Sequence, residues 1–201
     1  MKRVNMILYG LVMTAAAVLQ AEHTVVFQNG VSPLSDYTKC SDTFLPSLFP
    51  EQPFGEYRHV ALGGCGAPSY VLLRFDLGDY VAAKSKVTKA TLYLYPKLYT
   101  GIEASAKWYS VAAEWNENEA SWSRASSGVP WSRDGGEIFV AKQSGNITVE
   151  ETVHSWDVTE MVQYWVKFPH RNFGVMLRPG NELADFECWY YSSETALEQY
   201  R

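Results

Sequence analysis

The chain has 201 residues, of which 17 are basic and 22 acidic, giving a net charge of −5. Nucleic-acid binding needs a basic field, so this acidic balance excludes nucleic acid as the partner. The length fits a single domain with a sizeable hydrophobic core.

The first 21 residues have the pattern of a cleavable secretory signal. Lys2 and Arg3 precede an apolar run over residues 6–19, and small residues lead to Ala21. We expect cleavage after Ala21, with Ala17 as the second choice. An uncleaved signal anchor is the alternative, although the run is short for a membrane span. The protein is therefore expected to be secreted or held on a bacterial cell surface, with no membrane attachment after cleavage.

Signal removal makes the mature domain, residues 22–201, more acidic. The signal carries two basic residues and no acidic one, so 17 less 2 leaves 15 basic residues against 22 acidic ones, a net charge of −7. The negative electrostatic field of the mature domain disfavours binding of a polyanionic glycan, unless basic residues cluster locally.

A period of two dominates the mature chain. Leu92 and Leu94 alternate with Tyr93 and Tyr95, as in a half-buried antiparallel strand. Gly, Pro and Asn turn signals separate such runs. The pattern predicts an all-β fold, an antiparallel β-sandwich of jelly-roll type with one or two short helical turns. Further strand-like runs are predicted at residues 24–28, 70–75, 137–141, 173–178 and 186–191.

Three cysteines in an exported chain allow one disulfide, with three pairings and one thiol left over. We expect Cys40 to bond Cys65, because both lie in segments rich in Gly, Pro and Ser. Cys188 lies in a strand-like run and is expected to be a small buried apolar residue.

A short amphipathic helix is predicted after Trp156. Asp157 and Thr159 are residue types that favour a helix N-terminus, and Met161 and Trp165 follow at helical spacing.

An ordered series of short motifs resembles the DNRLRE domain, which overlaps carbohydrate-binding module family 96. The most informative block begins with Trp156, Asp157, Val158 and Thr159 and runs to residue 177. The resemblance implies a secreted β-sandwich associated with polysaccharides or cell surfaces. The other matching segments are residues 24–30, 37, 41–43, 54–55, 72–77, 87, 90–95, 115–117, 121–122, 135–136 and 192–194.

The chain end departs from this resemblance. The family's Ser-Ser-Glu segment is normally followed by another short strand, whereas this sequence stops at Arg201. We therefore expect the domain over residues 22–201 to lack the final strand, as in a fragment or a truncated gene product, unless the strand is supplied otherwise. The unpaired edge would favour self-association, with residues 189–191 beside it.

Catalytic motifs are missing from the sequence: it has no G-x-S-x-G, no H-E-x-x-H and no phosphate-binding glycine loop. Its four histidines have no ligand spacing. We expect no enzymatic activity and no cofactor. A structural calcium ion is the one metal considered, with Asp42 as its candidate ligand.

Aromatic and basic residues supply the candidate glycan contacts. Tyr93, Tyr95 and Lys97 lie opposite the apolar face of their strand, although another element could cover them. Trp115, Trp122, Trp156 and Trp165 are expected in the core. The remaining candidates lie in predicted loops, and they are Trp131, Arg133, Lys167, His170 and Arg171.

These features favour a non-catalytic extracellular module that binds a polysaccharide or cell-surface glycan. A structural or adhesive surface domain without glycan binding is the first alternative. A polysaccharide hydrolase or lyase is the second, since carboxylates are plentiful and an acid pair is defined by its separation in space.

Overall fold

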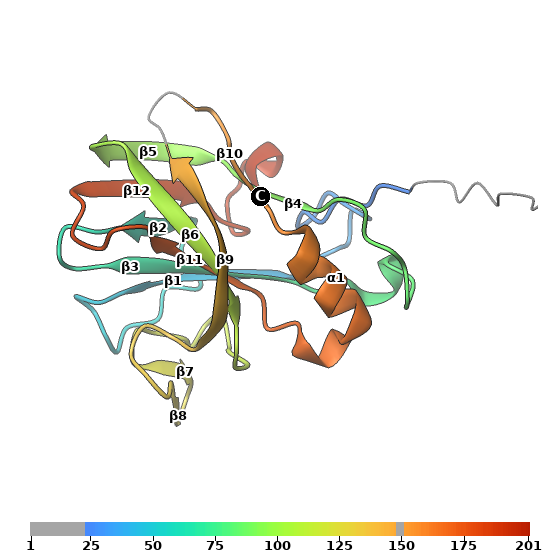
Figure 1. Ribbon diagram of the computed structural model, residues 1–201, viewed down its shortest axis with the longest axis horizontal. Coiled ribbons are helices and arrows are strands. Elements are labelled where there is room, and N and C mark those ends of the chain that lie inside the picture. The colour runs from blue at the N-terminus through green and yellow to red at the C-terminus, as the bar shows by residue number, and fades with distance from the viewer. Residues whose placement is uncertain (1–22, 148–150) are drawn as a thin grey trace, which may run out of the picture.

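The computed structural model describes residues 23–147 and 151–201 (Figure 1). The predicted signal at residues 1–21 lies outside the described residues. None of the helices in the described part of the chain is long and apolar enough to cross a membrane. In chain order the elements are β1 (Cys40–Pro46), β2 (His59–Gly63), β3 (Ser69–Phe75), η1 (Gly78–Tyr80), β4 (Thr91–Leu94), β5 (Pro96–Gly101), β6 (Ala104–Val111), β7 (Arg124–Ser126), β8 (Val129–Pro130), β9 (Ile138–Ile147), β10 (His154–Asp157), α1 (Thr159–Lys167), η2 (Pro169–Arg171), β11 (Val175–Pro179), β12 (Phe186–Tyr191) and η3 (Glu198–Tyr200).

The strands pair antiparallel. The main sheet follows the order β5-β12-β2-β3-β11-β6-β9, and β1 also pairs with β3. Two small sheets, β10-β4 and β7-β8, accompany it. The prediction of an all-β fold with antiparallel sheets and a short helix is therefore confirmed.

The first five residues of β3 are buried on both faces, which explains its apolar run from Tyr70 to Leu73. Val71 and Leu73 belong to the larger core, which strands β2, β11 and β12 also line. Tyr70 and Leu72 point the other way, into a second core. The segment that carries β7 and β8 contributes to that second core through Trp115 and other residues.

The predicted helix is confirmed as α1, which lies beside the sheet (Figure 1). Met161 and Trp165 are buried in the larger core. Before the first turn, an Asp157 carboxylate oxygen accepts the backbone N–H of Thr159 at 2.9 Å, so one of the free helix donors is satisfied. Thr159 Oγ1 accepts the N–H of Ala90, which joins the helix to the start of β4.

The strand predicted at residues 24–28 was wrong. Only Gln28 makes an isolated bridge, to Ser32. At the other end of the chain, β12 is hydrogen-bonded on both sides, to β2 and β5. Trp189 and Tyr191 therefore do not themselves form an unpaired edge, and the main strand path ends at β5 and β9.

The predicted disulfide between Cys40 and Cys65 was wrong, because all three cysteines are free. Cys40 opens β1 opposite Phe75, whereas Pro46 ends it opposite Ser69. Cys65 lies in the turn between β2 and β3, toward the Ser69 end. Six strand steps of about 3.3 Å put roughly 20 Å between the two ends of this ladder. A disulfide requires Cα atoms within about 7 Å.

The three thiols should differ sharply in reactivity. Burial raises the pKa of Cys40 to about 12 and that of Cys188 to about 11, so neither forms thiolate near pH 8. Cys65 is exposed, and its hydrogen bond to Asp185 raises its pKa without covering the sulfur. We predict that iodoacetamide at pH 8 labels one thiol of the reduced native chain, slowly, and three thiols in denaturant.

Mass spectrometry counts the labels, and Cys65→Ser should leave the native chain unlabelled. Rapid native labelling of Cys40 or Cys188 would contradict the assignment.

Candidate functional site

Four partly exposed rings form a continuous aromatic row: His59, Tyr191, Tyr200 and Tyr95. Tyr191 and Tyr200 stack with centroids 4.7 Å apart and planes at 13°. The centroid of the Tyr95 ring lies 5.4 Å from that of Tyr200, and the centroid of the His59 ring lies 5.5 Å from that of Tyr191. The row thus joins rings from four separate stretches of the chain.

Strand pairing positions three of these rings. Tyr191, the last residue of β12, pairs with His59, the first residue of β2. The backbone N–H of Tyr191 donates to the carbonyl of Tyr95 at 3.1 Å, so the segment linking β4 to β5 lies alongside.

The fourth ring, Tyr200, is brought in by the short helix η3. Gln28 holds this segment from the N-terminal side, since its amide donates to the carbonyl of Glu198 at 2.7 Å. Arg201 fixes the other side by donating from Nε to the Thr195 carbonyl at 2.8 Å. The segment that carries Tyr200 is therefore held by one distant contact and one local contact.

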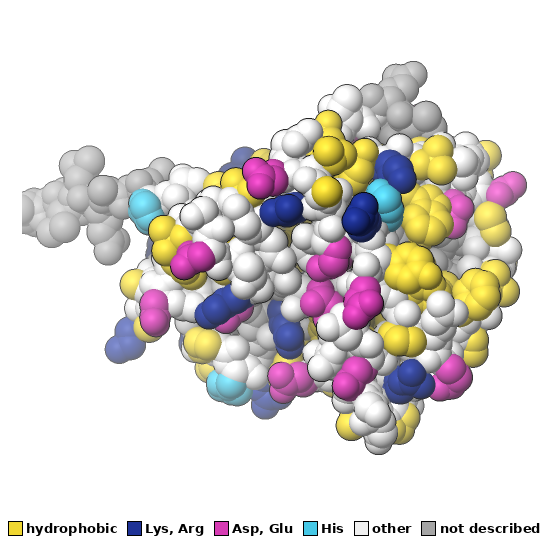
Figure 2. Space-filling model, turned by 180° about the vertical axis from the view of Figure 1, so that it is seen from behind, with side chains coloured by type: hydrophobic (Ala, Val, Ile, Leu, Met, Phe, Trp, Pro, Cys, Tyr) yellow, Lys and Arg dark blue, Asp and Glu magenta, His cyan; other side chains and the backbone are white. Residues whose placement is uncertain are grey.

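Two basic side chains accompany the row. Arg58 and Lys97 are exposed, and both influence His59. Burial is the main cause that lowers the pKa of His59, and Lys97 and Arg58 lower it further. His59 therefore favours its neutral form near pH 7. On the face drawn in Figure 2, basic and histidine side chains lie next to hydrophobic ones, while acidic side chains gather nearer the middle.

The predicted residues on β4 and β5 lie as the alternation indicated. Leu92 and Leu94 are buried, whereas Tyr93 is 56% exposed. Tyr95 joins the aromatic row and Lys97 accompanies it. Sequence reasoning missed His59, Tyr191 and Tyr200, because only the pairing of distant strands brings them to Tyr95.

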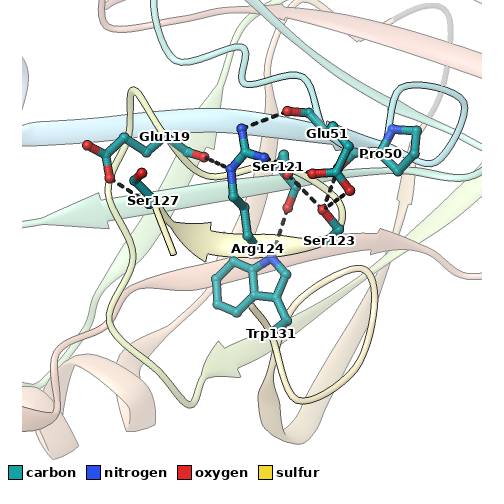
Figure 3. A network of polar contacts seen from close by, with 8 residues as sticks. All are labelled: Pro50, Glu51, Glu119, Ser121, Ser123, Arg124, Ser127 and Trp131. Carbon is teal, nitrogen blue, oxygen red and sulfur yellow. Dashed lines mark hydrogen bonds and ion pairs between the residues drawn. The ribbon is translucent and has the colours of Figure 1, made fainter. Parts of the chain in front are cut away.

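Trp131 is placed differently from the expectation of an exposed loop residue. It is 6% exposed, lies in the second core, and donates its indole N–H to the Ser121 carbonyl at 2.8 Å (Figure 3). Its ring is therefore unavailable for stacking on a sugar. Arg133 is exposed in the turn that follows.

The same close-up shows how the segment over the second core is held (Figure 3). Arg124 donates to a Glu51 carboxylate oxygen and to the Glu51 carbonyl, each at 2.8 Å, and to the Glu119 carbonyl at 3.3 Å. Ser123 adds bonds from its hydroxyl to the Pro50 carbonyl and the Glu51 carboxylate. These hydrogen bonds join the segment around residue 50 to the segment around residue 121.

Lys167, His170 and Arg171 gather at the end of α1 and in η2, where all three are exposed. Lys167 Nζ lies 5.1 Å from the centre of the Phe168 ring. The His170 ring meets Phe168 edge-on at 6.4 Å. These residues form a second basic and aromatic surface, built from elements other than those of the row.

Asp42, the predicted calcium ligand, is buried on β1 beside Glu117 and Glu194. One oxygen of each carboxylate lies within 4.8 Å of the others. Asp42 was anticipated from its residue type alone, and nothing local in the sequence joins it to the other two.

The bonds of Arg124 generate a stability prediction. Arg124→Ala should lower the free energy of unfolding by about 1–2 kcal/mol, mainly through the carbonyl bonds, because Glu51 is 72% exposed and water screens the ion pair. Ser127→Ala is the matched control, since only the backbone N–H of Ser127 bonds Glu119.

Urea unfolding followed by tryptophan fluorescence measures both variants. Equal midpoints for wild type and Arg124→Ala would show that this network does not stabilise the fold.

Residues 42–201 match the family model described as the disaggregatase related repeat domain. No curated protein matches the chain.

Proposed function

The chain belongs to the disaggregatase related repeat family, and we propose that this member is a non-catalytic extracellular module that binds a polysaccharide or a cell-surface glycan. The observation that carries the proposal is the aromatic row with Arg58 and Lys97 beside it. The resemblance to the DNRLRE domain and family 96 modules supports the same function.

The row has the chemistry that sugar recognition uses. Aromatic rings pack against the apolar C–H faces of pyranose rings, and phenol hydroxyls bond sugar hydroxyls at the wet edge. Tyr95, Tyr191 and Tyr200 bring three phenol rings together on one continuous, partly exposed strip. A linear glycan fits such a strip better than a compact metabolite, because the rings lie at the surface and not in an enclosed cavity.

The charge near the row bears on the kind of glycan. The chain as a whole is acidic, which repels polyanions at a distance. Arg58 and Lys97 offset this locally, so a polymer that combines neutral sugars with some acidic ones matches the surface. Neutral and uronic-acid polymers are both needed to test it.

A binding role is favoured over hydrolysis by the geometry of the acids. Glycosidase carboxylates flank a sugar, with roughly 5–9.5 Å between them. One oxygen of each of Asp42, Glu117 and Glu194 lies within 4.8 Å of the others, and Asp42 is only 6% exposed. A cluster centred on a buried acid does not match an acid pair that flanks a sugar.

Export is part of the proposal. The pattern over residues 1–21 is that of a secretory signal. A secreted module would meet extracellular polysaccharides directly, so the predicted location and the proposed ligand agree.

The test is retention on insoluble polysaccharides of plant, algal and bacterial origin. We predict that the mature chain is retained on at least one of them, and that Tyr200→Ala and Tyr95→Ala each weaken binding about tenfold, the effect of losing about 1.4 kcal/mol. Phe139→Ala removes another exposed aromatic ring, 59% exposed on β9, and should bind as wild type.

Reducing-end assays should show no turnover. Retention on none of the polymers would favour a structural or adhesive surface domain. Equal binding by the Tyr200 and Phe139 variants would exclude the row, and loss on Lys167→Ala would point to the surface at the end of α1.

A further inference from the structure

Three segments that are distant in the sequence meet at one cluster of carboxylates, in which Asp42 is buried and the two glutamates are partly exposed. Asp42 lies on β1, Glu117 follows β6 in a loop, and Glu194 comes just after β12. Their oxygens lie within 4.8 Å of one another. The three residues form what is called here the carboxylate cluster.

Two oxygens of the cluster are buried without a hydrogen-bond partner among the described residues: Asp42 Oδ1 and Glu194 Oε2. Asp42 is 6% exposed, so bulk water does not reach its free oxygen. A buried carboxylate oxygen with no donor is costly, because the charge loses its hydration and gains nothing in exchange. An unpartnered oxygen of this kind indicates that the site binds a ligand able to accept the oxygen's lone pairs.

The remaining oxygens are held by the protein, which fixes the geometry. Asp42 Oδ2 accepts the backbone N–H of Ser193 at 2.7 Å, and Glu194 Oε1 accepts the Ser193 hydroxyl at 2.7 Å. Glu117 Oε1 accepts the backbone N–H of Asp42 at 2.5 Å. Each of the three carboxylates therefore has one oxygen that accepts a hydrogen bond from the protein. These hydrogen bonds fix the positions of the carboxylates before any ligand binds.

The backbone around Glu117 is packed closely enough to require glycine. A Cβ on Gly55 would lie 2.1 Å from the Glu117 carbonyl oxygen. Trp115, two residues earlier, is 2% exposed and donates its indole N–H to the Phe173 carbonyl at 2.8 Å. Packing against the core therefore fixes the position of Glu117, although Glu117 lies in a loop.

Little positive charge offsets the cluster. Arg74 is the base that acts on Glu117, yet its guanidinium lies over the Trp115 ring and 3.9 Å from Glu114. That guanidinium is shared with Glu114 and so leaves most of the negative charge of the three acids uncompensated.

We propose that Asp42, Glu117 and Glu194 together bind one calcium ion. Calcium takes six to eight oxygen ligands, accepts carboxylates in one- or two-oxygen modes, and tolerates irregular geometry. The three carboxylates supply at least one oxygen each, with water completing the shell. The hard, all-oxygen donor set excludes metals that prefer sulfur or imidazole.

Bound calcium would tie β1, the loop after β6 and the turn after β12 into one unit. That turn leads to η3 and Tyr200, so the ion would fix the path of the chain toward the aromatic row. Calcium binding does not depend on the proposed glycan function and is tested without any glycan.

The experiment measures calcium binding to the mature chain after treatment with EDTA and dialysis. Isothermal titration at pH 8 should give one site for Ca²⁺, and the melting temperature should rise with Ca²⁺ concentration. Sodium chloride at matched ionic strength controls for screening. Magnesium chloride should act much more weakly, because Mg²⁺ demands near-octahedral geometry and keeps its water.

Glu117→Gln and Glu194→Gln should each weaken Ca²⁺ binding about tenfold or more. Both remove a repelling charge, so without metal they should melt no lower than wild type, which separates lost binding from lost folding. Glu114→Gln is the matched control on the same loop and should keep the calcium response.

A wild-type chain whose melting temperature and titration do not respond to Ca²⁺ would overturn the proposal. A response to Mg²⁺ with none to Ca²⁺ would overturn the assignment to calcium. An equal loss in the Glu114 and Glu117 variants would show a general charge effect and not a site.

Discussion

The buried Asp42 carboxylate determines where the last part of the chain lies. It accepts the N–H of Ser193, a residue 151 positions away, at 2.7 Å. Because an isolated buried carboxylate is unstable, its environment must supply donors or a cation. The turn after β12 is thereby held against β1, and the residues that follow it are directed toward Tyr95 and Tyr191. This contact therefore links the carboxylate cluster, through Glu194, with the segment that carries Tyr200 to the aromatic row.

The two candidate sites have different physical characters. The carboxylate cluster is built around one buried acid and is dominated by charge, whereas the aromatic row is partly exposed throughout and depends on ring contacts. The row also depends on sheet order, since β12 lies between β2 and β5 and aligns His59 and Tyr95 on either side of Tyr191. A rigid core under a surface of aromatic rings is the arrangement that glycan recognition favours, because little ordering is needed on binding.

Local patterns in the sequence were sufficient for several elements. The run at residues 186–191 matches β12, and the helix after Asp157 forms because capping and apolar spacing act within a few residues. The alternation of Leu92 with Tyr93 gave the correct face for each. Contacts between distant segments could not be read in this way. The register of β1 on β3 separates Cys40 from Cys65, and packing against the second core buries Trp131.

The carboxylate cluster illustrates the same limit. Asp42, Glu117 and Glu194 each lie in a short motif of the resemblance, but their meeting requires β1, the loop after β6 and the turn after β12 to fold together. Sequence reasoning therefore reached Asp42 and not its partners. In the same way it reached Tyr95 and Lys97, whereas the other rings of the row come from strands and a turn that only the tertiary fold makes neighbours.

The central claim is that the aromatic row contacts a glycan. NMR spectra of the chain with ¹³C-labelled tyrosine rings, titrated with an oligosaccharide from the polymer that retains the chain best, test it directly. We expect the signals of Tyr95, Tyr191 and Tyr200 to shift together at saturating ligand, while that of Tyr164 on α1 stays in place. Shifts confined to Tyr164, or unchanged signals from the three row tyrosines in a chain that is demonstrably bound, would contradict it.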